Sequence, residues 1–128
     1  MTCNITNGIK ISVEASYNGV IQKATDVLHF FSYKITITNT SNFTVQLLSR
    51  FWEITDTLNN KEFVEGKGVI GKTPIITPNQ TFSYQSNCFL LGETGTMKGY
   101  YTMLDKKANS LFKVYIPTFQ LTSSTLLN

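Results

Sequence analysis

A glycine-rich segment near the middle of the chain, Gly66–Thr73 (GKGVIGKT), contains the residues best suited to bind a ligand. Its three glycines, Gly66, Gly68 and Gly71, have the spacing of the dinucleotide-binding fingerprint GxGxxG. The segment also fits the P-loop pattern, GxxxxGK followed by Ser or Thr. Both motifs bind phosphate because glycines let backbone N–H groups close on the anion at the start of a helix. The residues that follow must therefore be able to form a helix.

The residues after this segment do not favour a helix. Pro74 follows at once, Ile75–Thr77 is β-branched, and Pro78 blocks a second turn. A dinucleotide site would also need an acidic residue about 20 positions downstream to bind the ribose, and Asn87–Phe89 lies there instead. We therefore exclude a Rossmann or P-loop site.

Two interpretations of the glycine-rich segment remain open. In the first, its backbone forms a nest for the anionic group of a phosphate-containing small molecule. The residues of this candidate ligand site are Gly66, Lys67, Gly68, Gly71 and Lys72. In the second, the glycines adopt positive φ angles in a loop that packs against the rest of the domain, and their role is structural.

Catalytic and metal-binding patterns are missing from the rest of the sequence. His29 is the single histidine, and Cys3 and Cys88 are far apart in the chain, so neither a nucleophile–His pair nor a transition-metal cluster is indicated. The scattered carboxylates leave binding of a hard cation open but have no calcium-loop spacing. We predict a protein that is not an enzyme and that has no catalytic residues, no metal site and no cofactor.

The Arg50-Phe51-Trp52 tripeptide and the Tyr100-Tyr101 pair are candidates for an interaction surface. Arg and Trp are over-represented among binding hot spots, and two adjacent tyrosines on one strand place one ring on each face. The candidate surface residues are Arg50, Trp52 and Tyr100. The alternative is that Trp52 belongs to the core and Arg50 pairs or stacks at its rim.

Composition limits the class of protein. The chain has 128 residues, 41% of them hydrophobic, with a formal net charge of +3, which indicates one domain with a substantial core. Its basic residues form no stripe, so we expect no nucleic-acid partner. No apolar run reaches the roughly 18–20 residues of a membrane span, and no signal peptide is recognisable. Two distant cysteines indicate free thiols, and we expect a cytoplasmic protein.

Apolar and polar residues alternate along most of the chain, which is typical of strands with one wet face. The predicted strands are Ile9–Tyr17, Phe31–Thr38, Phe43–Thr55, Lys61–Glu65, Thr81–Phe89, Thr96–Leu104 and Ser110–Ile116. Asn18-Gly19 is expected to end the first strand, with a polar loop up to about Asp26. The third strand changes phase, which predicts a β-bulge near Ser49-Arg50. Pro117 is expected to kink the last strand or to lie at a sheet edge.

These elements predict an all-β fold with about seven to eight strands and little or no helix. The length and turn spacing favour an immunoglobulin-like or fibronectin type III-like sandwich of two antiparallel sheets. A single domain is expected over residues 1–128, with its core at about 9–121 and loose tails at both ends.

Five blocks of the sequence resemble the ApaG family, also called CorD. They are Val45–Asp56, Val64–Gly71, Phe82–Cys88, Gly95–Met103 and Phe112–Phe119. The resemblance implies a fibronectin type III-like sandwich in a small stand-alone bacterial protein, associated with cobalt resistance and magnesium efflux. Related domains in eukaryotic F-box proteins look like protein-interaction modules. For the glycine-rich segment, the resemblance implies a candidate for pyrophosphate or nucleotide binding.

The chain departs from the family pattern at three positions. Phe51 stands where the family usually has His, so a metal or proton role for that His is not expected here. Glu65 and Lys72 reverse the charges that usually flank the glycines. The sequence therefore favours a non-enzymatic binding or regulatory module that acts on an unidentified protein partner. Binding or processing of a phosphoanhydride at Gly66–Gly71 is the alternative, and a homodimer remains open.

Overall fold

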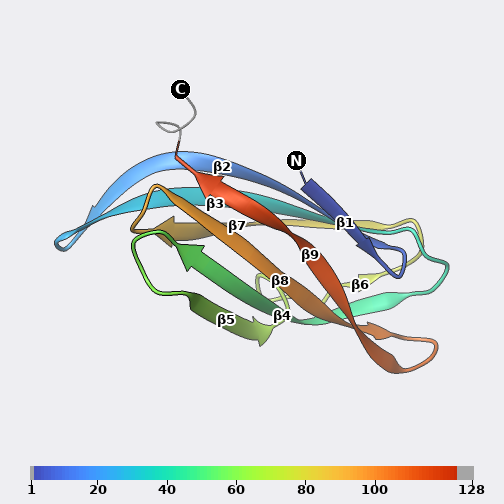
Figure 1. Cartoon of the computed structure of the whole chain (residues 1–128). Coiled ribbons are helices and arrows are strands. Elements are labelled where there is room, and N and C mark those ends of the chain that lie inside the picture. Colours follow the sequence, from blue (N-terminus) through green and yellow to red (C-terminus); the bar gives the residue numbers. More distant parts are fainter. Residues whose placement is uncertain (1, 124–128) are drawn as a thin grey trace.

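The computed structural model describes residues 2–123 and places them in two antiparallel β-sheets that face each other (Figure 1). Sheet A has the order β1-β2-β3-β7 and contains β1 (Thr2–Thr6), β2 (Ile9–Lys23), β3 (Asp26–Asn39) and β7 (Thr81–Leu90). Sheet B has the order β5-β4-β8-β9 and contains β5 (Glu62–Lys67), β4 (Val45–Asp56), β8 (Thr94–Asp105) and β9 (Ser110–Thr122). The short β6 (Ile75–Ile76) pairs with β4.

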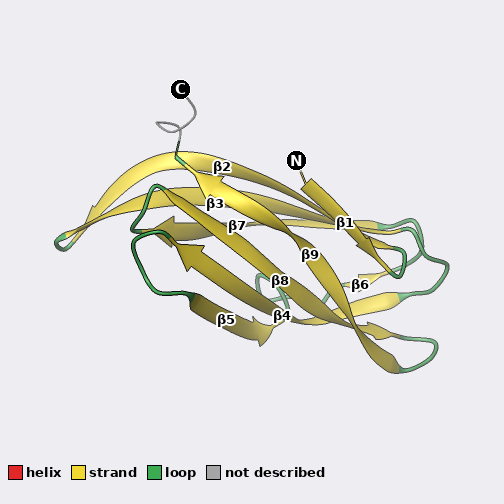
Figure 2. Ribbon diagram, viewed as in Figure 1, coloured by secondary structure: helices red, strands yellow, loops and turns green. Residues whose placement is uncertain are grey.

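The prediction of an all-β, immunoglobulin-like sandwich is confirmed. Residues 2–123 contain nine strands and no helix, as the secondary-structure colouring shows (Figure 2). This part of the chain therefore has no helix that could cross a membrane. The alternation seen in the sequence has its expected cause, because every second side chain of a strand points into the space between the sheets.

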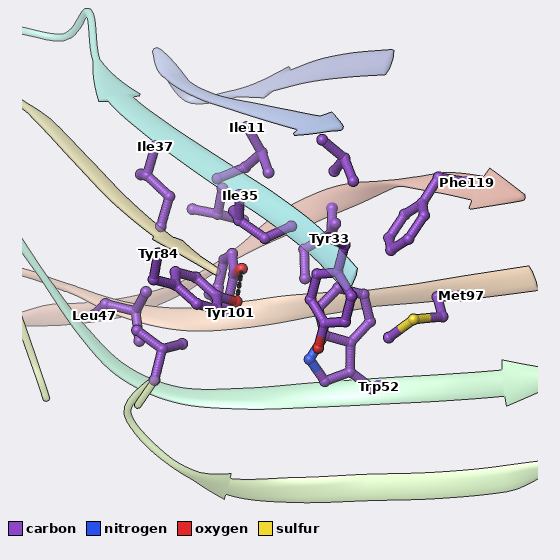
Figure 3. Close-up of a cluster of buried hydrophobic side chains, with 14 of the residues drawn as sticks. Ile11, Tyr33, Ile35, Ile37, Leu47, Trp52, Tyr84, Met97, Tyr101 and Phe119 are labelled. Carbon is purple, nitrogen blue, oxygen red and sulfur yellow. Dashed lines mark hydrogen bonds between the residues drawn. The ribbon is translucent and has the colours of Figure 1, made fainter. Parts of the chain in front are cut away.

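Aliphatic and aromatic side chains of both sheets fill the core (Figure 3). Sheet A contributes isoleucines such as Ile11 and Ile35, and sheet B contributes Leu47 and Met103. At one end of the core, Tyr33 packs edge-on against Trp52, with ring centroids 5.6 Å apart. Figure 3 shows the two side chains next to each other between the sheets.

Two expectations about the ends of strands were wrong. The segment from Asn18 to Asp26 is not a loop, because β2 continues through an irregularity after Tyr17 and turns into β3 only at Ala24-Thr25. Gly19, with φ of 97°, accommodates that irregularity where a turn was expected. The N-terminal tail is not loose over residues 2–6, which pair with β2 as β1. The predicted loose tail at 123–128 begins with Ser123, which is buried, and its remainder lies outside the described residues.

Two predicted irregularities are present. The register of β4 against β8 shifts between Leu47 and Ser49, so the extra residue is Leu48, one position before the predicted site. In β9, Pro117 and Thr118 lie in a second register shift opposite β8, and β9 is the edge strand of sheet B. Pro117 therefore lies where its missing N–H does not interrupt a central ladder.

The two lateral edges of the sandwich differ. On one side, β9 packs against β1 and β2 of the opposite sheet, and the N–H of Tyr115 donates to Oγ1 of Thr6 at 3.3 Å. On the other side, the edge strands are β5 and β7, which do not pair with each other. The space between the sheets opens along this second side.

Candidate functional site

The glycine-rich segment forms a tight turn after β5. Val69 and Lys72 exchange two backbone hydrogen bonds, each of 2.9 Å, and enclose Ile70 and Gly71, which have φ of 43° and 76°. Two consecutive positive φ angles are characteristic of a type I′ turn. The side chain of Val69 is 1% exposed and anchors the turn in the core. The segment is thus a β-turn packed against the sandwich and does not lead into a helix.

The backbone amides of this turn are directed at carbonyl groups of the protein. The N–H of Gly68 donates to the carbonyl of Leu48 at 2.7 Å, and the N–H groups of Val69 and Lys72 donate to each other's carbonyls. These three amides are therefore not aimed at an external anion, as a phosphate nest requires. Gly68 has φ of 64°, and a Cβ there would collide with the carbonyl oxygen of Lys72.

The guanidinium group of Arg50 contacts the turn. Nη1 of Arg50, on β4, donates to the carbonyl oxygens of Lys67 at 3.1 Å and Gly68 at 2.8 Å. Gly66 makes room for this arrangement, because a Cβ at that position would lie 3.0–3.1 Å from the guanidinium group. The side chains of Lys67 and Lys72 are exposed to solvent. The turn thus presents carbonyl oxygens to Arg50 and fixes the position of its side chain.

Arg50 also lines a cavity between the two sheets. The cavity has a volume of 530 Å³ and lies at the open side of the sandwich, between β5 and β7. Its walls are Trp52, Ile54 and Met97 from sheet B, Tyr33, Tyr84 and Cys88 from sheet A, and Val64, Val69 and Ile70 from β5 and the turn. Glu62, Ser86, Asn87 and Phe89 complete the lining.

Burial controls the ionisation of the groups around this cavity. It raises the pKa of the Tyr33 and Tyr84 phenols, and the positive charge of Arg50 opposes that rise in both cases. Burial likewise raises the pKa of the Cys88 thiol to about 11, with a smaller contribution from the carboxylate of Glu62. At neutral pH the phenols and the thiol are therefore uncharged.

Trp52 is in the core, and the outward-facing aromatic residue of its strand is its neighbour. Trp52 is 3% exposed and packs against Phe119, with centroids 5.9 Å apart. Phe51 points to the other face of sheet B, because adjacent residues of a strand alternate. The placement of Trp52 on an interaction surface therefore needs correction. Its side chain is part of the cavity lining, and Phe51 takes the outer position.

Four aromatic side chains cross the outer face of sheet B from edge to edge, and we call them the aromatic strip. Phe51 stacks on Phe63 and on Tyr100, with centroids 6.0 and 5.1 Å apart, and Tyr100 meets Tyr115 edge-on at 6.0 Å. Phe63 and Tyr115 are 59% and 50% exposed. Next to the strip is a groove of 370 Å³, which Phe51, Tyr100 and Tyr115 help to line.

Charged side chains surround the aromatic strip. Glu53 forms ion pairs with Lys98 at 3.1 Å and with Lys61 at 3.8 Å. Nζ of Lys113 lies 4.5 Å from the centre of the Tyr100 ring. An apolar strip with a charged border has the composition of many protein-docking surfaces.

The structure thus separates the predicted site residues into two places. Arg50, Gly66 and Gly68 are together at the cavity, with Trp52 in its wall, whereas Tyr100 lies on the opposite face of sheet B. The sequence did not identify the cavity partners on β3 and β7, chiefly Tyr33 and Tyr84. Their alternation predicted core positions, but no local signal shows where a sandwich is left unfilled.

No group of three potential metal ligands (His, Cys, Asp or Glu) comes together within residues 2–123. Cys3 is exposed, Cys88 is buried, and neither is in a disulfide. Asp56 is buried at the end of β4 and accepts backbone hydrogen bonds from Leu58, Leu91 and Gly92, so its carboxylate has a structural role.

Comparison with known proteins identifies the family. The family described as "ApaG domain" matches residues 21–105. The chain belongs to the ApaG family. It is 49% identical over 100 residues to the Protein ApaG of Bdellovibrio bacteriovorus, which covers 78% of each chain. It is 38% identical over 117 residues to the Protein ApaG of Brucella abortus, which covers 91% of this chain and 89% of the relative.

Solved structures share the ApaG-type fold seen here. An X-ray structure of a structural-genomics target superposes with a TM-score of 0.89 at 34% identity and covers 95% of this chain and 92% of the other. The crystal structure of a Bordetella pertussis protein under the name ApaA gives a TM-score of 0.80 at 32% identity, with 91% and 94% covered. The family expectation drawn from the five sequence blocks is therefore confirmed.

Proposed function

We propose that this ApaG-family protein is a non-enzymatic binding module that acts on a protein partner through the aromatic strip. The observation that supports the proposal is a continuous row of four aromatic rings in contact, one each from β5, β4, β8 and β9, partly exposed and bordered by charges. Exposed aromatic rings provide large contact areas at a low cost in side-chain entropy, and they are frequent in binding hot spots.

The proposed setting of this module is the cytoplasm, which fits one exposed and one buried free cysteine. The family resemblance links such a module to cobalt resistance and magnesium efflux. In our proposal the chain contributes to these processes through the partner that it binds.

The test compares the wild-type protein with a Phe63→Ser/Tyr115→Ser double variant. Both rings are largely exposed, so the double variant should keep its fold, with a free energy of unfolding within about 1–2 kcal/mol of the wild type. A photo-crosslinking residue at position 63 should capture a defined partner from extracts of the native organism, and introducing Tyr115→Ser into that protein should abolish the capture. In a strain that lacks the protein, the wild-type gene should restore cobalt tolerance and the double variant should not.

Leu58→Ser is the matched control, because Leu58 is an exposed apolar residue at 72% on the β4–β5 turn, outside the aromatic strip. It should behave like the wild type in both assays. Undiminished capture by the crosslinking protein that carries Tyr115→Ser, together with full cobalt tolerance of the double variant, would contradict the proposal. Self-association in sedimentation equilibrium that the double variant abolishes would identify the partner as a second copy of the chain.

The second candidate is binding or processing of a phosphoanhydride at Gly66–Gly71. The exposed Lys67 and Lys72 beside the turn favour it, whereas the hydrogen-bonded amides of Gly68, Val69 and Lys72 do not. This candidate predicts that about 1 mM pyrophosphate with magnesium raises the unfolding midpoint by several degrees. A Lys67→Ser/Lys72→Ser variant should lose the shift. This variant is preferable to Gly68→Val, which would disturb the turn itself.

A further inference from the structure

The cavity between β5 and β7 combines a predominantly apolar lining with one partly buried cation. Its 530 Å³ volume lies in the range of about 300–1,000 Å³ typical of small-molecule sites. The apolar surface that a ligand can reach belongs to the partly buried Ile54 and Val64, whereas Trp52 and Tyr84 are only 3% and 6% exposed and offer it little surface. The aromatic strip is on the other face of sheet B, so the proposed docking role does not involve this space.

Arg50 is held in position but is not neutralised. Its Nη1 group is engaged by the carbonyls of Lys67 and Gly68, which are dipoles without net charge. Among the described residues, the recorded ion pairs join Glu53 to Lys61 and Lys98, and Arg50 takes part in neither. The guanidinium group has five N–H donors, and neither Nε nor Nη2 takes part in the two hydrogen bonds to the turn.

The charged residues of the cavity lining favour a ligand with a single negative charge. Glu62 also lines the cavity, but it is exposed, so solvent screens its charge more than that of the half-buried Arg50. Its position at the cavity nevertheless opposes the entry of multiply charged anions. The hydroxyl groups of Tyr33 and Ser86 add neutral polar groups to the same lining.

We propose that this cavity is a binding site for a small organic monoanion, a carboxylate with an aromatic or alkyl body. The carboxylate pairs with Arg50, and the body lies against Ile54 and Val64, in the part of the cavity that Trp52 also lines. The site needs no rearrangement of the turn, because Gly66 and the two carbonyl contacts already hold Arg50 in place. Preorganisation of this kind lowers the entropic cost of binding.

The test titrates the protein with 3-phenylpropionate and follows the fluorescence of Trp52, the single tryptophan of the chain. A saturable change is expected, because Trp52 is part of the cavity wall. The uncharged analogue 3-phenylpropanol has nearly the same body and should bind at least about tenfold more weakly, since it lacks the charge-assisted bond to Arg50. The dianion phenyl phosphate should also bind more weakly.

Two variants test the position of the site. Arg50→Met should weaken binding of 3-phenylpropionate by about tenfold or more and remove the preference over the alcohol. Val64→Phe keeps Arg50 and fills part of the cavity, so it should abolish binding even if Arg50→Met fails to fold. Glu65→Phe is the matched control, because it adds the same ring to the opposite face of β5 and should bind like the wild type.

The proposal is overturned if wild-type protein shows no saturable change with either 3-phenylpropionate or octanoate. Equal affinity for the acid and the alcohol, or undiminished binding in Val64→Phe, would also overturn it. The Phe63→Ser/Tyr115→Ser variant separates this inference from the proposed function: it should bind 3-phenylpropionate normally while losing the protein partner.

Discussion

The sandwich is closed along one lateral edge and open along the other. At the closed edge, β9 packs against β1 and β2, and its Pro117 bulge lies at the sheet boundary. At the open edge, β5 and β7 remain apart, and the turn after β5 inserts Val69 between the sheets. Strand packing closes the first edge. At the second edge only side chains fill the space between the sheets, and they leave a cavity.

The open edge is where a β-sandwich of this size can accommodate a ligand. A closed edge uses its apolar side chains to complete the core, and replacing them costs packing energy. An open edge has edge strands of unequal length, here β5 with residues 62–67 and β7 with residues 81–90, so some inward side chains lack a partner across the gap. Arg50 is in this position, because its hydrogen bonds go to the turn after β5, whereas Trp52 packs against Tyr33 of sheet A.

The largest expected loss of stability comes from truncating an aromatic side chain at the closed edge or at the cavity of the open edge. Phe119 belongs to the closed edge and Trp52 to the wall of the cavity, and the two rings contact each other. Replacement of either by Ala should lower the free energy of unfolding by about 3–5 kcal/mol. Phe119→Ala should be the more costly of the two, because it leaves an enclosed void, whereas Trp52→Ala enlarges a cavity that is already open. Urea denaturation measures both values, and the reverse order would contradict the distinction between the edges.

Alanine substitution of the two glycines at the open edge should lower the stability of the protein by different amounts. Gly68→Ala places a Cβ against the backbone carbonyl of Lys72 at a positive φ and should cost about 2–4 kcal/mol. Gly66→Ala meets the movable end of Arg50 and should cost less than about 1 kcal/mol. Thermal unfolding of the two variants measures the difference. A cost for Gly66→Ala as large as that for Gly68→Ala would mean that the Arg50 side chain cannot shift away from the added Cβ.

The buried thiol of the open edge should make stability fall at alkaline pH. The pKa of Cys88 is about 11 in the folded protein against a reference value of 9.0, so folding favours the neutral thiol. Its stabilising contribution is therefore complete below pH 9 and is lost as the pH rises towards 11, and it amounts to about 2–3 kcal/mol. Denaturation curves at about pH 8 and pH 11 measure the loss.

Cys88→Ala is the control for this titration, because the alanine variant cannot ionise at that position. The phenols of Tyr84 and Tyr101 also have raised pKa values through burial and contribute in both proteins. The thiol contribution is the difference between the two pH dependences. If wild type and variant lose stability in parallel from pH 9 to 11, Cys88 is more accessible from the open edge than the structure indicates.

Much of the fold could be predicted from alternation alone. The phase change in the third strand indicated a bulge, and the extra residue is Leu48, next to the predicted position. Two errors arose where local signals were ambiguous. Asn18-Gly19 has turn chemistry but lies in a strand irregularity, and Thr2–Thr6 is a strand with few buried side chains. Periodicity depends on burial, so an exposed strand has little of it.

The candidate site could be predicted only in part. Arg50 and the glycines were recognisable by residue type, but their contact depends on β4 and β5 pairing in a register that places Arg50 opposite Gly66. The cavity depends in addition on Tyr33 and Tyr84, which come from the other sheet. The position of Trp52 could be predicted: the bulge puts it on the same face of β4 as Leu47, so its core interpretation is confirmed, and Phe51 lies on the outer face.

The contact between Arg50 and the turn has a consequence for the divergence of related chains. Gly66 avoids a Cβ next to the guanidinium, so the absence of a side chain at position 66 is useful only while Arg50 is present. A lineage that replaced Arg50 with a small residue would be released from the need for glycine at position 66. Substitutions at positions 50 and 66 should therefore occur together, and their joint occurrence would distinguish chains that keep the cation from those that have lost it.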